Sequence, residues 1–152
     1  MKKTLPAVMF CLSFPVAPAV ADEGAMLYQS NCGVCHQDRA QGRPGRVPPL
    51  SGRIGRISTT PEGRQYVVAV ALNGMMGRMT EAGETYAGFM PSFRMLPDGQ
   101  IAAILNHVAS LPDGVRTPFY SADDIAAGRM EKLSPPAVTD RRRALEASSP
   151  LP

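Results

Sequence analysis

The sequence predicts an all-α fold with one domain and an appended C-terminal segment. Its 152 residues with 44% apolar content can bury one hydrophobic core, whereas two independent cores would need a longer chain. Helix-start signals or apolar residues at helical spacing occur in three segments, at 22–30, 59–72 and 98–111. The first of these leads to a pair of cysteines, and no strand-rich pattern precedes that pair.

The composition leaves such a core short of bulky side chains. Aromatic residues make up 6% of the chain and Trp is absent, while Gly (14), Pro (15) and Met (9) are plentiful. A large prosthetic group would supply the missing volume. The formal charge is +3, but two of the 16 basic residues lie in the N-terminal segment considered next. Without them the balance is close to neutral, so nucleic-acid binding is not expected.

Residues 1–21 have the order of a secretory signal peptide. Two lysines are followed by an apolar stretch from Leu5 to Val20 and then by small residues before Asp22. This pattern predicts export to the periplasm with cleavage after Ala21. A transmembrane helix is the alternative, but 16 residues containing three prolines are too short and too interrupted to span a bilayer. Cys11 would leave with the signal peptide.

The first predicted helix, residues 22–30, leads directly to the motif Cys32-Gly33-Val34-Cys35-His36. This motif is typical of c-type haem attachment. Two thiols at this spacing reach the two vinyl groups of one porphyrin, and the adjacent imidazole meets the iron. A redox Cys-X-X-Cys, a zinc site with the distant His107, and a simple disulfide are the alternatives.

The next segments read as a loop and a helix. Residues 41–55 hold four glycines and three prolines, which predicts an irregular loop laid over a supporting surface. Thr59-Thr60-Pro61-Glu62 is a helix-start pattern, and Asn73-Gly74 ends the helix that follows. The last core helix opens near Asp98 as its cap and ends at Leu111-Pro112.

A second axial ligand for the iron is expected from a methionine. The candidates are Met75, Met76, Met79, Met90, Met95 and His107. Met90 is favoured because the following Pro91 stiffens its loop and holds Met90 extended. The other methionines are expected to pack as soft filler. His107, near the core-facing stripe of the last helix, is expected to pack where helices cross rather than to bind iron.

On the Cys-X-X-Cys-His motif at 32–36 and the Met-Pro pair at 90–91, the chain resembles the class I c-type cytochromes over residues 22–112. Gly24 and Tyr28 match a glycine and an aromatic of that family at the crossing of its N- and C-terminal helices. The resemblance implies a cytochrome c fold, with those two helices crossing over one covalently bound haem c.

Three further positions match the family. The resemblance implies that the carbonyl of Pro48 accepts the N–H of the His36 imidazole, that Leu50 packs on the haem, and that Arg56 lies near a haem propionate. It also implies single-electron transfer between redox partner proteins, from a periplasmic dehydrogenase to a terminal oxidase or another cytochrome. A haem enzyme with a labile sixth ligand, peroxidase-like or sulfur-oxidising, is the alternative.

Residues 113–152 form a proline-rich C-terminal extension. Its five prolines, together with Pro112 just before it, predict short helices only, at Ser121–Ala127 and Thr139–Ala147. The extension either wraps the domain or docks a partner subunit. Arginines gather in sequence near the haem motif, and we expect one or two to neutralise propionates and the rest to form a basic rim that steers an acidic partner. They are Arg39, Arg43, Arg46, Arg53, Arg56 and Arg64.

Overall fold

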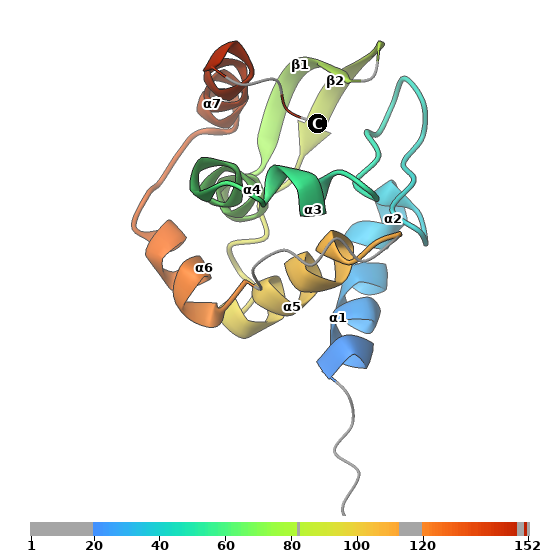
Figure 1. Ribbon diagram of the computed structural model, residues 1–152, viewed down its shortest axis with the longest axis vertical. Coiled ribbons are helices and arrows are strands. Elements are labelled where there is room, and N and C mark those ends of the chain that lie inside the picture. Colours follow the sequence, from blue (N-terminus) through green and yellow to red (C-terminus); the bar gives the residue numbers. More distant parts are fainter. Residues whose placement is uncertain (1–19, 82, 113–119, 149–150, 152) are drawn as a thin grey trace, which may run out of the picture.

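The computed structural model describes residues 20–81, 83–112, 120–148 and 151. Apart from its last two residues, the predicted signal peptide lies outside this part of the chain. Within it, ten elements follow in order and are labelled in Figure 1. They are α1 (Val20–Tyr28), η1 (Gln29–Gly33), α2 (Val34–His36), α3 (Ile54–Ile57), α4 (Pro61–Asn73), β1 (Met75–Glu81), β2 (Glu84–Met90), α5 (Asp98–Ala109), α6 (Ala122–Arg129) and α7 (Pro135–Ser148).

The prediction of an all-α fold is wrong in one respect, because β1 and β2 form a two-stranded antiparallel hairpin. Its register runs from the pair Met75–Met90 to the pair Glu81–Glu84, and Gly83 in the turn has a φ of 81°. The segment escaped prediction because methionine and glycine in β1 give no β-branched pattern. The hairpin matters for function because Met90 is the last residue of β2.

The first and last core helices cross closely, as the resemblance implies. A Cβ placed on Gly24 would lie 2.6 Å from the carbonyl oxygen of Ala103, so only glycine lets α1 approach α5 at this point. Tyr28 is fully buried there, and its ring centroid lies 5.5 Å from that of His107. Figure 1 shows the two helices against each other in the lower half of the molecule.

The ends of α4 follow the sequence signals, and the start of α5 does not. Thr60 caps α4 by accepting a hydrogen bond from the Gly63 backbone N–H at 3.0 Å, and the chain leaves the helix at Gly74, whose φ is 73°. The prediction that Asp98 caps α5 is wrong. Asp98 lies inside the first turn of α5, and its carboxylate pairs with Arg129 instead.

The extension wraps the domain and holds a longer helix than predicted. Helix α6 begins with a capping box between Ser121 and Asp124. Helix α7 has 14 residues, because its two prolines occupy the first turn, where no intrahelical N–H is lost. Ile125 and Val138 are fully buried in the same apolar cluster as α4 and α5. Helices α6 and α7 of the extension therefore pack into the core of the domain.

Candidate haem site

A cavity of about 250 Å³ lies between the two apolar clusters of the core. A well-packed domain of this size leaves few voids larger than a water molecule, so a hollow of this volume marks a place for a bound group. Most of its walls are apolar side chains from α3, α4, the hairpin and α5. Six of the seven predicted site residues line it: Cys32, Cys35, His36, Pro48, Leu50 and Met90.

The two thiols are presented on consecutive helical turns. Cys32 in η1 is half-buried and Cys35 in α2 is exposed, and the two are not joined as a disulfide. Burial, together with the neighbouring Cys35, raises the pKa of the Cys32 thiol to about 11, so this thiol is protonated at neutral pH. In the described part of the chain, no three His, Cys, Asp or Glu side chains converge to hold a metal ion.

His36 is held by the chain segment that follows it. Gln37 takes a left-handed φ of 68°, which ends α2 and reverses the chain, and the loop then returns to bring Pro48 beside the imidazole. His36 is only 6% exposed, and its Nδ1 lies 3.0 Å from the carbonyl oxygen of Pro48. A carbonyl can only accept a hydrogen bond, so Nδ1 carries the proton and donates it.

That hydrogen bond decides what His36 can do. Burial lowers the pKa of the His36 imidazole, and the hydrogen bond to Pro48 raises it by a smaller amount. The pKa is therefore below its ordinary value, and the ring is neutral at pH 7. With the proton on Nδ1, the lone pair of Nε2 is free to bind a metal ion. The close return of the loop depends on Gly42, because a Cβ there would lie 2.4 Å from the Val47 carbonyl oxygen.

The structure reduces the list of methionine candidates. Met75, Met79 and Met90 line the cavity, whereas Met76 and Met95 do not and are exposed. Met75 already accepts a hydrogen bond at its sulfur from the Tyr66 hydroxyl, at 3.7 Å. Met90 closes the hairpin opposite Met75 and enters a loop that begins with Pro91.

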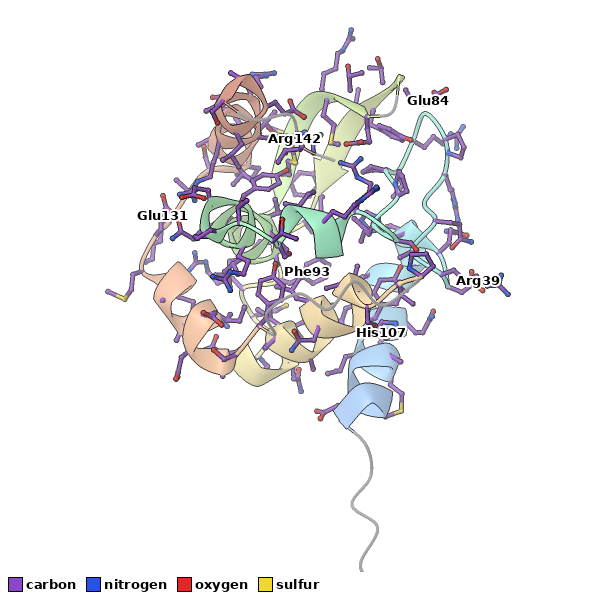
Figure 2. All side chains as sticks on the ribbon, viewed as in Figure 1. Arg39, Glu84, Phe93, His107, Glu131 and Arg142 are labelled. Atoms are coloured by element: carbon purple, nitrogen blue, oxygen red, sulfur yellow. The ribbon has the colours of Figure 1, made fainter. Side chains whose placement is uncertain are left out.

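His107 lies outside the cavity lining. Its ring packs on Tyr28 at the crossing of α1 and α5, and Figure 2 shows it near α1. Burial lowers its pKa, so this imidazole is also neutral. Its place agrees with the packing role at the helix crossing that the sequence predicts.

The resemblance implies that Arg56 lies near a propionate, but the arginine that lines the cavity is Arg53, three positions earlier. Arg56 is exposed and does not line the cavity, whereas Arg53 is buried and does. Arg53 pairs with the buried carboxylate of Glu81 on β1. Glu81 also accepts a hydrogen bond from Arg142 of α7 at 2.8 Å, and Arg142 in turn pairs with Glu146 at 2.6 Å.

Arg142 is the candidate site residue that the sequence analysis missed. The sequence shows it only as part of a basic triplet in the extension, yet it is 4% exposed and lines the cavity. Figure 2 places it between α7 and the hairpin. A signal was present, because Arg142 follows the apolar Val138 by one helical turn and so shares its buried face.

On the charged side of the cavity, one buried donor is left without a partner within the described part of the chain. Arg142 Nε is the one buried side-chain nitrogen or oxygen that lacks a hydrogen-bond partner among the described residues. Burial, followed by the repulsion from Arg142, lowers the pKa of Arg53 to about 10. Two thiols, a metal-binding imidazole, apolar walls and a cationic edge are what a haem with its two propionates requires. The residues present therefore fit that group.

Part of the cavity lining is exposed to solvent. Six exposed residues make up this part of the lining, which we call the mouth. They are Cys35, Arg46, Gly77, Gly88, Phe89 and Pro91. Phe89 is the largest of the apolar ones and is 64% exposed.

Comparison with known proteins agrees with this geometry. The family model described as cytochrome c matches residues 21–112. One cytochrome c-552 of Thermus thermophilus is 39% identical over 150 residues, which cover 95% of this chain and 98% of that protein. Another cytochrome c-552 from Thermus thermophilus is 38% identical over 128 residues, which cover 81% of this chain and 96% of that protein. The chain belongs to the cytochrome c family, as a class I c-type cytochrome that binds one covalently attached haem c and carries electrons.

Proposed function

We propose that the chain is an exported, periplasmic carrier of single electrons whose haem is attached through Cys32 and Cys35. The observation that carries this proposal is that both thiols, His36 and the distant Met90 line one largely apolar cavity. When bound, the haem supplies a reversible one-electron couple of its iron. Cys32 and Cys35 would anchor the ring, His36 and Met90 would bind the iron, and the apolar walls would keep water from most of the site.

His36 and Met90 are the proposed axial ligands. Pro48 fixes the tautomer of His36 so that Nε2 binds iron, and it also holds the ring in one orientation. Met90 is preferred over Met75, whose sulfur already has the Tyr66 hydroxyl as a partner. Leu50 contributes to the apolar wall.

Arg53 and Arg142 are proposed to receive the propionates, in place of the expected Arg56. Both guanidinium groups are buried at the cavity, and Arg142 Nε has a hydrogen bond left to donate. In Figure 1, α7 and the thiol-bearing α2 lie on different sides of the molecule, which suits a ring whose propionates stand away from its vinyl groups.

Electron exchange is proposed to occur at the mouth. Phe89 and the neighbouring glycines expose an apolar edge there, and Arg46 adds a positive charge beside it. Arg39, Arg43 and Arg56 are also exposed, whereas Arg53 is buried and is not part of the proposed basic rim. A rim of this sign would attract an acidic redox partner and speed the encounter.

The rim is tested by the double variant Arg43→Glu with Arg46→Glu. We expect electron transfer with an acidic partner cytochrome to slow by about tenfold or more at low ionic strength, and the difference to shrink as salt rises. The double variant Arg141→Glu with Arg143→Glu, with the same charge change on α7, is the control. Equal rates for the rim variant and the native protein would remove the basic rim from the proposal.

The organisation of the chain follows from the same proposal. Residues 1–21 are the signal peptide removed after Ala21, residues 22–112 are the cytochrome c domain, and residues 113–152 are the extension. In the part of the chain with described coordinates, no helix has the length and apolar character needed to cross a membrane. The proposed donor is a periplasmic dehydrogenase, and the acceptor is a terminal oxidase or another cytochrome.

The central experiment is the mass and visible spectrum of the exported protein. We expect one haem added to a polypeptide that begins at Asp22, and a weak band near the red end of the oxidised spectrum from the Met–iron bond. Met90→Ala should abolish that band, and Met75→Ala and Met79→Ala should keep it. Absence of added haem would end the proposal. Ready binding of cyanide or carbon monoxide by the native protein would favour the haem enzyme with a labile sixth ligand.

A further inference from the structure

Residues 91–97 connect Met90 at the end of β2 to α5, and we call this segment the Met90 loop. The first half of the loop is hydrogen-bonded to α4. The hydroxyl of Ser92 donates to the carbonyl oxygen of Leu72 at 2.5 Å, and the backbone N–H of Phe93 donates to that of Ala71 at 2.9 Å. Gly74 lets the loop pass close by, since a Cβ there would lie 2.5 Å from the Met90 carbonyl oxygen. These contacts fix the loop up to residue 93.

The second half of the loop is held from the extension, by Arg129 at the end of α6. Its Nη1 and Nη2 donate to the carbonyl oxygens of Arg94 and Leu96, each at 2.6 Å, and its Nε donates to Asp98 Oδ1 at 2.5 Å. The planar guanidinium thus meets three acceptors with three of its donors. About three quarters of the Arg129 and Asp98 side chains is shielded from water, so water replaces these bonds poorly.

Arg94 of the loop in turn donates hydrogen bonds to the extension and to α4. Its Nη1 donates to the carbonyl oxygen of Arg129 at 3.1 Å, and its Nη2 donates to the carbonyl oxygen of Glu131 at 2.9 Å and to Asn73 Oδ1 at 2.8 Å. In Figure 2 Glu131 lies on the connection between α6 and α7. We call Asn73, Arg94, Asp98 and Arg129 the arginine clasp. It joins the end of α4, the Met90 loop and the extension.

We propose that Arg129 is a positioning residue for Met90, and that the clasp keeps the second axial position closed to external ligands. The inference rests on the ligation by Met90 proposed above. Met90 can leave the iron only if its loop moves outward, and the clasp adds the loss of these charge-assisted bonds to the free energy of that local opening. The extension thereby helps to make the chain a carrier rather than a ligand-binding haem protein.

The test uses the haem-loaded Arg129→Gln variant, which keeps a long polar side chain but loses the positive charge and the several N–H donors of the guanidinium. We expect the Met–iron band to disappear at a lower temperature than in the native protein. We also expect cyanide to bind on the order of tenfold faster, because the loop opens more often. Arg129→Lys keeps the charge beside Asp98 but cannot reach three acceptors, so its cyanide rate should lie between the two.

Arg143→Gln is the matched control. Arg143 also lies in the extension and pairs with Asp140, but both side chains are mostly exposed and neither touches the loop. Its band and cyanide rate should equal those of the native protein. A native cyanide rate in Arg129→Gln, or an equal acceleration in Arg143→Gln, would overturn the inference. If Arg129→Gln yields no folded holoprotein, Arg129→Lys alone decides between these outcomes. Absence of the band in the native protein would instead refute the ligation by Met90.

Discussion

The two sides of the haem cavity are built in opposite ways. The side with Cys32, Cys35 and His36 comes from five consecutive residues, and the backbone carbonyl of Pro48 completes it twelve positions later. The Cys32 thiol and the His36 imidazole are neutral there at pH 7. The opposite side comes from three distant segments, where Arg53, Glu81 and Arg142 meet through buried ion pairs.

The two sides are therefore sensitive to different kinds of substitution. The thiol side needs its residue types and spacing, and these tolerate no substitution because the chemistry is covalent. The charged side needs the fold, since Glu81 and Arg142 are 61 positions apart and contact only when α7 lies on β1. Buried charges of this kind cost free energy whenever one partner is lost. The predictions below test this contrast.

The largest effect is expected on the thiol side. The double variant Cys32→Ala with Cys35→Ala should be exported without covalent haem, because no sulfur remains to bond the vinyl groups. The mass of the purified polypeptide checks this directly. Cys11→Ala, in the predicted signal peptide, should leave the haem content unchanged. Covalent haem in the double variant would contradict the whole assignment of the site.

On the charged side, Glu81→Gln should lower the free energy of unfolding by about 3 kcal/mol, because it leaves two buried guanidinium groups facing each other with less compensation. Denaturant unfolding of the haem-loaded protein measures the change. Glu84→Gln, at the exposed end of the same hairpin, should cost little. Similar losses of unfolding free energy in the two variants would show that the buried ion pairs of Glu81 stabilise the fold no more than the exposed Glu84 does.

A smaller effect separates the two candidate partners of the propionates. Arg53→Gln should lower the reduction potential by roughly 50 mV, equivalent to about 1 kcal/mol, because a buried positive charge favours the reduced iron. Arg56→Gln should change the potential much less, since Arg56 is exposed and screened. Potentiometric titration of both variants measures the two shifts. A larger shift in Arg56→Gln than in Arg53→Gln would favour Arg56 as the partner of a propionate, as the resemblance implies.

The last effect is expected outside the cavity lining, at the start of α6. Ser121→Ala should cost about 1 kcal/mol of unfolding free energy, because the Asp124 N–H loses its cap. Hydrogen bonds from the Ser121 backbone and then its hydroxyl lower the pKa of Asp124. The contribution of Asp124 is therefore present above its ordinary pKa and is lost as pH falls through the lowered folded value.

The pH dependence can be checked with Asp124→Asn. Its unfolding free energy should differ from that of the native protein at neutral pH, and the difference should shrink below about pH 4. Ser148→Ala is the control for Ser121→Ala, because Ser148 lies at the exposed end of α7 and does not cap the start of a helix. A difference that stays constant down to strongly acidic pH would contradict the role given to the carboxylate.

Local patterns explain which predictions succeeded. The helix start at Thr60-Pro61 and the stop at Gly74 depend on neighbouring residues only, and both agree with the structure. The cap assigned to Asp98 is wrong because a distant guanidinium, Arg129, competes for the same carboxylate. The hairpin was missed because its strands depend on pairing with each other and on packing against α7, and neither leaves a periodic pattern in methionine- and glycine-rich sequence.

The cofactor chemistry could be predicted from the amino-acid sequence, because a covalent attachment motif acts through residue type and spacing within five positions. The sequence also indicated the imidazole and the Met-Pro loop as candidates for the two axial positions. The arginines that face the cavity and the contacts that hold the Met90 loop could be identified only from the folded chain. Those answers depend on α6 and α7 lying against the domain, and contacts between residues more than 30 positions apart are set by the packing of the whole core.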